Sequence, residues 1–273
     1  MTSQKLERLR RRFDQGGWTE LFHWARLWIH WNLKLYQVPI TARHLRDVIR
    51  ELRADAAVLR QDYEPGVRQV MSSHIKPGWV CVDLGANIGQ SALAMARLAT
   101  PGGKVIAFEA FPHNAARLRR NLRIRGFAKS VRVENLAVSD GQSPHLTIYA
   151  GRNRSDFEWN VIGRDVAGQE TAAEMEIAAV ALDQYFPPGS RINFIKIDIE
   201  GAEALALIGM RRILREARPV IVIEFHTNND GWSGRHELFS AGYTLYDLKG
   251  SLIQANDKKR YQCFALPPNM SPA

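Results

Sequence analysis

The sequence has little cysteine: Cys81 and Cys263 are the only two in 273 residues. Two cysteines cannot build a disulfide framework or a tetrahedral zinc site, and both stand in apolar runs that favour buried, reduced thiols. No stretch approaches the roughly 18 uncharged apolar residues that span a bilayer. The basic N-terminus is interrupted by Asp14, Gly16 and Gly17, where a secretory signal needs an apolar run. We therefore expect a cytoplasmic protein.

The chain also lacks internal repeats and low-complexity tracts. Hydrophobic residues make up 45% and charged residues 24% of it, the proportions of a folded globular protein rather than a disordered one. The length suits one large α/β domain with an added segment, or two small domains.

The excess of positive charge is uneven. The net charge is +9, of which residues 1–60 carry +6 and residues 110–133 carry +7, so the remainder carries −4. Two basic zones are compatible with phosphate or acidic partners, although a solvated helix face explains each of them more simply. Neither interleaves aromatic and basic residues as a single-strand nucleic-acid groove does.

The first 62 residues are expected to form a helical extension. A Trp-rich helix from Trp18 to about Tyr36 is apolar nearly all round, and a third helix from Thr41 to about Arg60 has one apolar face. Such helices need a partner surface. We favour packing on the main domain or in a homodimer, with peripheral contact to a membrane as the alternative.

From Trp79 onward, strand-like runs alternate with helical patterns. Helices are expected at 88–98, 112–125, 203–215 and near 233–241. This alternation predicts a parallel sheet covered on both faces, in a domain spanning residues 63–266 and followed by a frayed tail, 267–273. A region at about 139–180, with the strand-like runs HLTIYA and EIAAV, breaks the rhythm.

The strongest chemical signal is the run VDLGANIGQ after a buried strand and before a helix. Gly85 permits a sharp turn, and Gly89 permits a ligand to approach the helix N-terminus. Asp83 ends the strand as an anion that suits an amine. Glu109 ends the next strand, about twenty residues past Gly89, where a ribose-diol acceptor belongs in a nucleotide-binding unit.

The turn differs from the dinucleotide fingerprint, because Asn87 stands where a glycine would make room for a pyrophosphate. S-adenosylmethionine has an amine, a carboxylate, a ribose and an adenine, but no phosphate. It therefore suits the pair of Asp83 and Glu109. The alternative is a plain strand–helix turn with glycines for geometry alone.

Four ordered motifs, VDLGANIGQSA, KVIAFEAFPHNAARLRRNL, IKIDIEGAE and IVIEFH, resemble the FkbM-type S-adenosylmethionine-dependent methyltransferases. The resemblance covers about residues 60–250. It implies a doubly wound, mostly parallel seven-stranded sheet of the class I, Rossmann-like methyltransferase type, with the N-terminal helices as an extension. It also implies O-methylation, often of sugars or polyketide-type natural products. The donor site then comprises Asp83, Gly85, Ala86, Asn87, Gly89, Gln90, Ser91, Glu109, Ala110, Asn114, Asn135 and Asp198.

Two further strands end in polar residues. Lys196, Asp198 and Glu200 share a parity and, if the strand stays extended, a face; the same holds for Glu224 and His226. If the two strands are neighbours, as the resemblance implies, these side chains meet at the transferred methyl group.

Methyl transfer to a hydroxyl needs a base to remove its proton. His226 is the first candidate, because imidazole titrates near neutrality. Asp198 orients the substrate or the donor, while Glu200 and Glu224 hydrogen-bond neighbouring hydroxyls. The rival arrangement uses Asp198, Glu224 and His226 to bind a divalent metal ion. We expect a metal-independent enzyme.

The acceptor is expected to be a hydroxylated small molecule or a glycan, recognised in part by the polar loop 151–162. Two other functions remain open. A nucleic-acid methyltransferase would use the basic zones, although acids at the mouth of the site would repel a phosphate backbone. A non-catalytic, cofactor-binding scaffold would use the Trp-rich helices to recruit a partner.

Overall fold

A computed structural model describes residues 49–56, 59, 64–151, 161–162, 171–226, 234–257 and 262–271. The chain divides into two compact units, Met1–Arg60 and Gln61–Ala273. In the first unit, residues 49–56 are helical, within the helix predicted for 41–60, whereas the predicted helix 18–36 lies outside the described residues. No described helix is long and apolar enough to cross a membrane.

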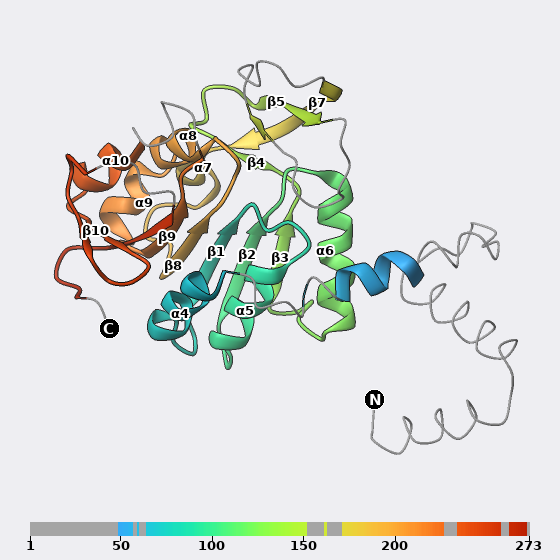
Figure 1. Ribbon diagram of the computed structural model, residues 1–273, viewed down its shortest axis with the longest axis horizontal. Helices are drawn as coiled ribbons and strands as arrows, with labels where there is room; N and C mark the ends of the chain where they lie inside the picture. Colours follow the sequence, from blue (N-terminus) through green and yellow to red (C-terminus); the bar gives the residue numbers. More distant parts are fainter. Residues whose placement is uncertain are drawn as a thin grey trace, which may run out of the picture. The chain divides into compact units, whose positions relative to one another are not determined.

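The second unit is built on a mixed sheet with the order β11-β10-β12-β9-β8-β1-β2-β3 (Figure 1). Five neighbouring strands, β9, β8, β1, β2 and β3, run parallel to one another. The other three, β12, β10 and β11, are each antiparallel to the strands beside them. The strands are β1 (Val80–Leu84), β2 (Lys104–Phe108), β3 (Val131–Glu134), β8 (Phe194–Ile197), β9 (Val220–Glu224), β10 (Thr244–Asp247), β11 (Leu252–Ile253) and β12 (Gln262–Leu266).

The predicted class is confirmed, with one addition at the edge. Seven strands make the doubly wound sheet, and the two-residue β11 adds an eighth. It forms because Gly250 takes a positive φ of 87° and the Asp247 N–H bonds to the Ser251 carbonyl, which folds the chain back into a hairpin.

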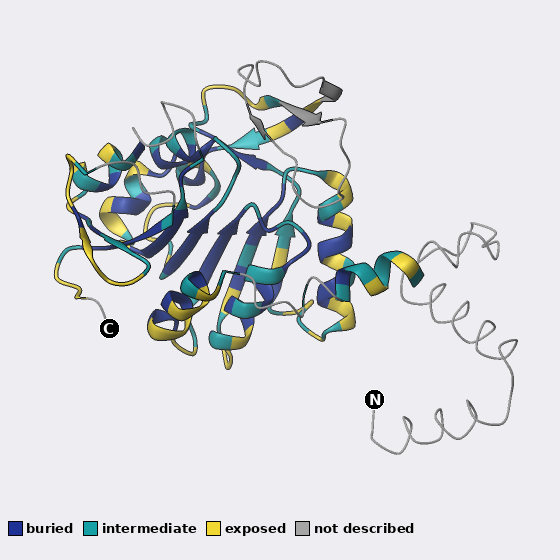
Figure 2. Cartoon of the chain, in the orientation of Figure 1, coloured by how far each residue is buried: buried dark blue, intermediate teal, exposed yellow. Residues whose placement is uncertain are grey.

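Helices cover both faces of this sheet. On β1, Val82 and Leu84 belong to a core that includes residues of α8 to α10, while Cys81 and Asp83, which point the other way, are also fully buried. The central strands are accordingly buried along their length (Figure 2). The helices are α4 (Pro65–His74), α5 (Gln90–Leu98), α6 (Pro112–Ile124), α7 (Leu182–Tyr185), α8 (Glu203–Ile208), α9 (Arg211–Glu216) and α10 (Arg235–Ser240).

The single helix predicted at 203–215 is wrong in one respect, because it is broken into α8 and α9. Gly209 lies so close to Ser139 that a Cβ would stand 1.9 Å from the Ser139 carbonyl oxygen. After the break, the Asp183 carboxylate accepts the backbone N–H groups of Arg212 (2.7 Å) and Ile213 (3.0 Å). Asp183 thus caps the new helix from a distant segment.

The region that interrupts the alternation of strands and helices forms a second sheet with the order β4-β7-β5-β6. Its strands are β4 (Ala137–Val138), β5 (His145–Gly151), β6 (Val161–Ile162) and β7 (Thr171–Val180). The strands predicted for HLTIYA and EIAAV lie within β5 and β7. Most of the predicted recognition loop, residues 152–160, is outside the described residues.

Candidate functional site

The candidate residues gather where β1, β2, β8 and β9 end. These four strands are parallel neighbours, so their carboxyl ends meet at one edge of the sheet. The chain turns sharply there after β1. Gly85 (φ 80°), Asn87 (φ 47°) and Gly89 (φ 108°) all take left-handed conformations. A Cβ on Gly85 would stand 1.8 Å from the Asp198 carbonyl oxygen, so this turn is pressed against the end of β8.

Glu109, directly after β2, is fixed by the turn beside it. Its Oε2 accepts the Asn87 N–H at 2.7 Å, and its Oε1 accepts the Phe111 N–H at 2.9 Å. Burial raises the pKa of Glu109 to about 7, although these bonds and the Asn114 side chain oppose the rise. The predicted ribose acceptor therefore lies beside the glycine turn, as its spacing indicates.

Other predicted donor-site residues lie next to Glu109 and the glycine turn. Asn135 clamps the chain after β2, because its Nδ2 donates to the carbonyls of Glu109 and Ala110, both at 2.8 Å. Gln90 and Ser91 begin α5, and Ala86 is buried in the turn before it.

Asp83 and Lys196 lie side by side on β1 and β8 and are both buried. Lys196 Nζ contacts Asp198 Oδ2 at 2.6 Å. Neither Asp83 oxygen has a hydrogen-bond partner of ordinary geometry among the described residues, although the Ala92 backbone N–H is close enough to oppose a rise in the Asp83 pKa. Burial raises the pKa of Asp83 to about 6, an effect that Lys196 opposes and Asp198 strengthens.

Asp83→Asn should therefore stabilise the ligand-free protein at pH 8. A raised carboxyl pKa means that the folded state loses stability as the pH rises from about 4 through about 6. Asparagine removes this loss, worth about 1–3 kcal/mol in the free energy of unfolding. Urea unfolding at several pH values measures it, and the gain should vanish below about pH 4. A gain or loss independent of pH would contradict this account.

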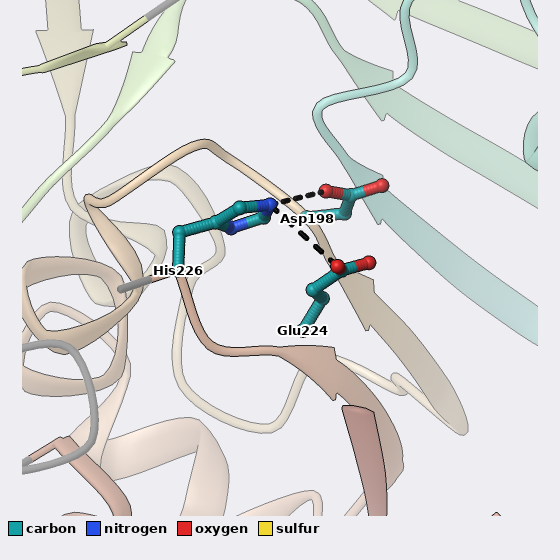
Figure 3. A group of neighbouring side chains, drawn as sticks. All are labelled: Asp198, Glu224 and His226. Atoms are coloured by element: carbon teal, nitrogen blue, oxygen red, sulfur yellow. Dashed lines mark ion pairs between the residues drawn. The ribbon is translucent and has the colours of Figure 1, made fainter. Parts of the chain in front are cut away.

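His226 faces three carboxylates across the ends of β8 and β9. Its Nε2 lies 3.4 Å from Glu200 Oε2, 3.7 Å from Asp198 Oδ1 and 3.8 Å from Glu224 Oε1. Figure 3 shows the imidazole edge turned toward Asp198 and Glu224. The structure thus brings together the four predicted catalytic residues. The extended strand assumed for Glu200 is wrong, because β8 ends at Ile197 and Glu200 has a φ of 52°.

Sequence reasoning treated Glu203 only as a helix start, but its side chain orients His226. It is completely buried, and its Oε1 accepts the Nδ1–H of His226 at 2.9 Å and the Gly201 N–H at 3.0 Å. Burial would lower the pKa of His226, yet Glu203, Glu200 and Asp198 raise it to about 9. The prediction that this imidazole titrates near neutrality is therefore wrong for the ligand-free protein.

Two more residues of the site were missed. Gln262, at the start of β12, donates from Nε2 to Glu64 Oε1 (2.7 Å) and to Glu224 Oε2 (2.8 Å). Burial raises the pKa of Glu64 to about 7; Lys196 opposes this shift, while Asp198 and Glu224 add to it. Glu64 takes a left-handed φ of 51° directly before Pro65, a conformation that the sequence does not show.

One family model matches more than half of the chain. The family model described as "Methyltransferase FkbM domain" matches residues 83–245. The antimetabolite synthetase AmbE of Pseudomonas aeruginosa is 28% identical over 232 residues, 71% of this chain but 11% of that protein. The methyltransferase sdnD of Sordaria araneosa is 31% identical over 157 residues, 47% of this chain and 59% of the relative. The chain thus spans only part of either relative.

Among solved structures, the methyltransferase FkbM from Methylobacillus flagellatus is similar, at 18% identity and a TM-score of 0.47. The match covers 81% of this chain and 60% of that one.

Proposed function

This chain belongs to the FkbM methyltransferase family, and from that premise we propose that it transfers the methyl group of S-adenosylmethionine to a hydroxyl oxygen of a small molecule or glycan. The observation that carries the proposal is the pairing of two sites at one sheet edge. A buried carboxylate, Glu109, stands beside a glycine turn, and a cluster able to handle a proton stands at the ends of β8 and β9.

The residues around the turn fit the donor. A carboxylate has about four acceptor positions; backbone N–H groups occupy two on Glu109, and some of the rest remain for ribose hydroxyls. Asp83 has two buried oxygens without a regular hydrogen bond, which suits a cationic group. When bound, S-adenosylmethionine supplies an electrophilic methyl group on a sulfonium.

The acceptor hydroxyl must lose its proton as the new oxygen–carbon bond forms. His226 is not ready for that task in the ligand-free protein, because its raised pKa keeps the imidazole protonated at neutral pH. Glu200 is the better proton acceptor. Its side chain is 41% exposed and it lies 3.4 Å from Nε2, while burial raises its carboxyl pKa despite His226 nearby. Asp198, Glu224 and His226 then position the hydroxyl.

The test incubates the full-length chain with donor labelled in the methyl group and with fractionated metabolites, glycans and RNA. We expect the label in a small-molecule or glycan fraction as an O-methyl group, identified by mass spectrometry. Glu200→Gln should lower the turnover by about 10²–10⁴-fold while leaving donor affinity nearly unchanged. Label found in RNA alone, or on nitrogen, would overturn the proposal.

Donor binding should weaken at low pH because of Glu109. Its anionic form accepts ribose hydroxyls, and its pKa in the free protein is about 7. The affinity for S-adenosylhomocysteine should fall by up to about tenfold per pH unit below 7 and level off above about 8. Calorimetry measures this. Glu109→Gln is the control: its binding should be weaker throughout, with a flatter pH profile.

A further inference from the structure

We propose that Asp198, Glu224 and His226 bind a divalent metal ion of the manganese type, through two carboxylates and the imidazole Nε2. The inference deepens the proposed function and rests on it only for the role of the ion. Among the residues that the structure describes, these three offer ligand atoms that lie within 4.8 Å of one another. They come from the ends of two adjacent parallel strands (Figure 3).

Glu203 fixes the orientation of the imidazole and leaves Nε2 as the nitrogen that can bind a metal ion, which must replace the Nε2 proton. Glu203 is fully buried, and a carboxylate only accepts hydrogen bonds, so the hydrogen in the 2.9 Å contact belongs to His226 Nδ1. Nε2 then faces the other carboxylates. Metal-binding histidines characteristically donate their second N–H to a carboxylate in this way, which fixes the ring and the tautomer.

Each ligand carboxylate uses one oxygen for support and presents the other to Nε2. Asp198 Oδ2 receives Lys196 Nζ at 2.6 Å, while Oδ1 lies 3.7 Å from Nε2. Glu224 Oε2 accepts Gln262 Nε2–H at 2.8 Å, while Oε1 lies 3.8 Å from His226 Nε2. Ligand atoms of the three residues thus lie within 4.8 Å of one another, and Asp198 and Glu224 are each held by a neighbouring side chain.

The separations suit an ion better than a proton. A hydrogen bond would bring Nε2 to about 2.7–3.2 Å from an oxygen, and both distances exceed that. Ligands bonded to one ion at about 2.1 Å, with angles of about 110–130° between bonds, stand about 3.4–3.8 Å apart. The mixture of imidazole and carboxylates favours a transition metal such as Mn²⁺ over Mg²⁺.

At this position the ion would neutralise part of the acid cluster and hold the acceptor oxygen next to Glu200. A bound hydroxyl is more acidic, because the positive charge stabilises the oxyanion as it forms. With three protein ligands set this far apart, a four- or five-coordinate ion keeps an open position for the acceptor oxygen.

The test titrates the full-length, metal-stripped protein with Mn²⁺ alone, without donor, and follows free Mn²⁺ by electron paramagnetic resonance. We expect stoichiometric binding and a nitrogen coupling from imidazole in the pulsed spectrum. His226→Gln should abolish the coupling, and Asp198→Asn or Glu224→Gln should weaken Mn²⁺ binding by about tenfold or more. Glu203→Ala should weaken it by about 10–100-fold. His236→Gln, which alters an exposed histidine on α10, should change neither signal.

Thermal unfolding shows which variants are folded. If His226→Gln does not fold, Glu224→Gln still tests the metal site. Folded protein that binds S-adenosylhomocysteine but no Mn²⁺ would overturn this inference and leave the proposed function standing. Mn²⁺ bound without a nitrogen coupling would overturn it as well. Mn²⁺ binding by a protein that binds no S-adenosylhomocysteine would support the metal site and overturn the proposed donor.

Discussion

Gly85→Ala should destabilise the protein more than Gly89→Ala, the same change at the other glycine of the turn after β1, which we call the donor turn. The new Cβ would stand 1.8 Å from the Asp198 carbonyl oxygen and 2.9 Å from its carbon, both backbone atoms of β8's end. Because Asp198 N–H also bonds to the Leu84 carbonyl (3.1 Å), the two strand ends cannot separate without breaking that contact. We expect a loss of about 4 kcal/mol or more in the free energy of unfolding.

Gly126→Ala is the matched control. Gly126 has nearly the same φ (81° against 80°), but no atom stands within 4 Å of the added Cβ. It should therefore show the cost of the left-handed conformation alone, about 1–2 kcal/mol. Urea unfolding measures both variants, and calorimetry with S-adenosylhomocysteine should detect binding by Gly126→Ala only. Equal losses would mean that the turn can move away from β8.

The donor turn was predictable because its determinants are local. Gly85 and Gly89 supply the positive φ angles that this tight turn between a buried strand and a helix requires, and Glu109 follows at a spacing set by one helix and one strand. The sheet was predictable for a similar reason, since alternating apolar strands and helices restrict the topology strongly.

The side-chain cluster at the ends of β8 and β9 was predictable only in part. Strand parity put Glu224 and His226 on one face of their strand, and the resemblance implied that this strand lies beside the one that ends near Asp198. The strands β8 and β9 are indeed parallel neighbours. Glu64 and Gln262 could not be paired in advance, because their contact joins residues 198 positions apart. Glu203 has an ordinary local explanation at a helix start, and only the tertiary fold shows that its buried carboxylate reaches His226.

The break between α8 and α9 depends on a similar long-range contact. Within the sequence, Gly209 is one glycine in an otherwise good helical pattern. The fold brings Ser139 against it and Asp183 against the start of α9, and these distant groups end one helix and begin the next. Tertiary contacts therefore determine the elements that adjoin the site, even where local propensity favours continuity.

Lys196→Met should be the most damaging change in the acid cluster. Burial would lower the pKa of Lys196, but Asp198, Asp83 and Glu64 together hold it above its ordinary value. Conversely, burial would raise the pKa of Asp198, which Lys196 and His226 keep below its ordinary value. Removing the ammonium leaves buried carboxylates without their main counter-charge. We expect a loss of about 3–5 kcal/mol in the free energy of unfolding at pH 8.

The pH dependence and a rescue identify the cause of that loss. Without Lys196, the already raised carboxyl pKa of Asp83 rises further in the folded state, and that of Asp198 rises from its lowered value. The deficit should therefore grow with pH above about 5 and shrink as the carboxyls protonate. Asp83→Asn should restore part of the stability of Lys196→Met at pH 8, because it removes one of the uncompensated charges. Lys104→Met, at an exposed position of β2, should change stability by no more than about 0.5 kcal/mol. Urea unfolding of the four proteins at pH 5 and pH 8 measures these effects. A pH-independent deficit without rescue would mean that Lys196 acts through packing, and that the acid cluster folds without its charge.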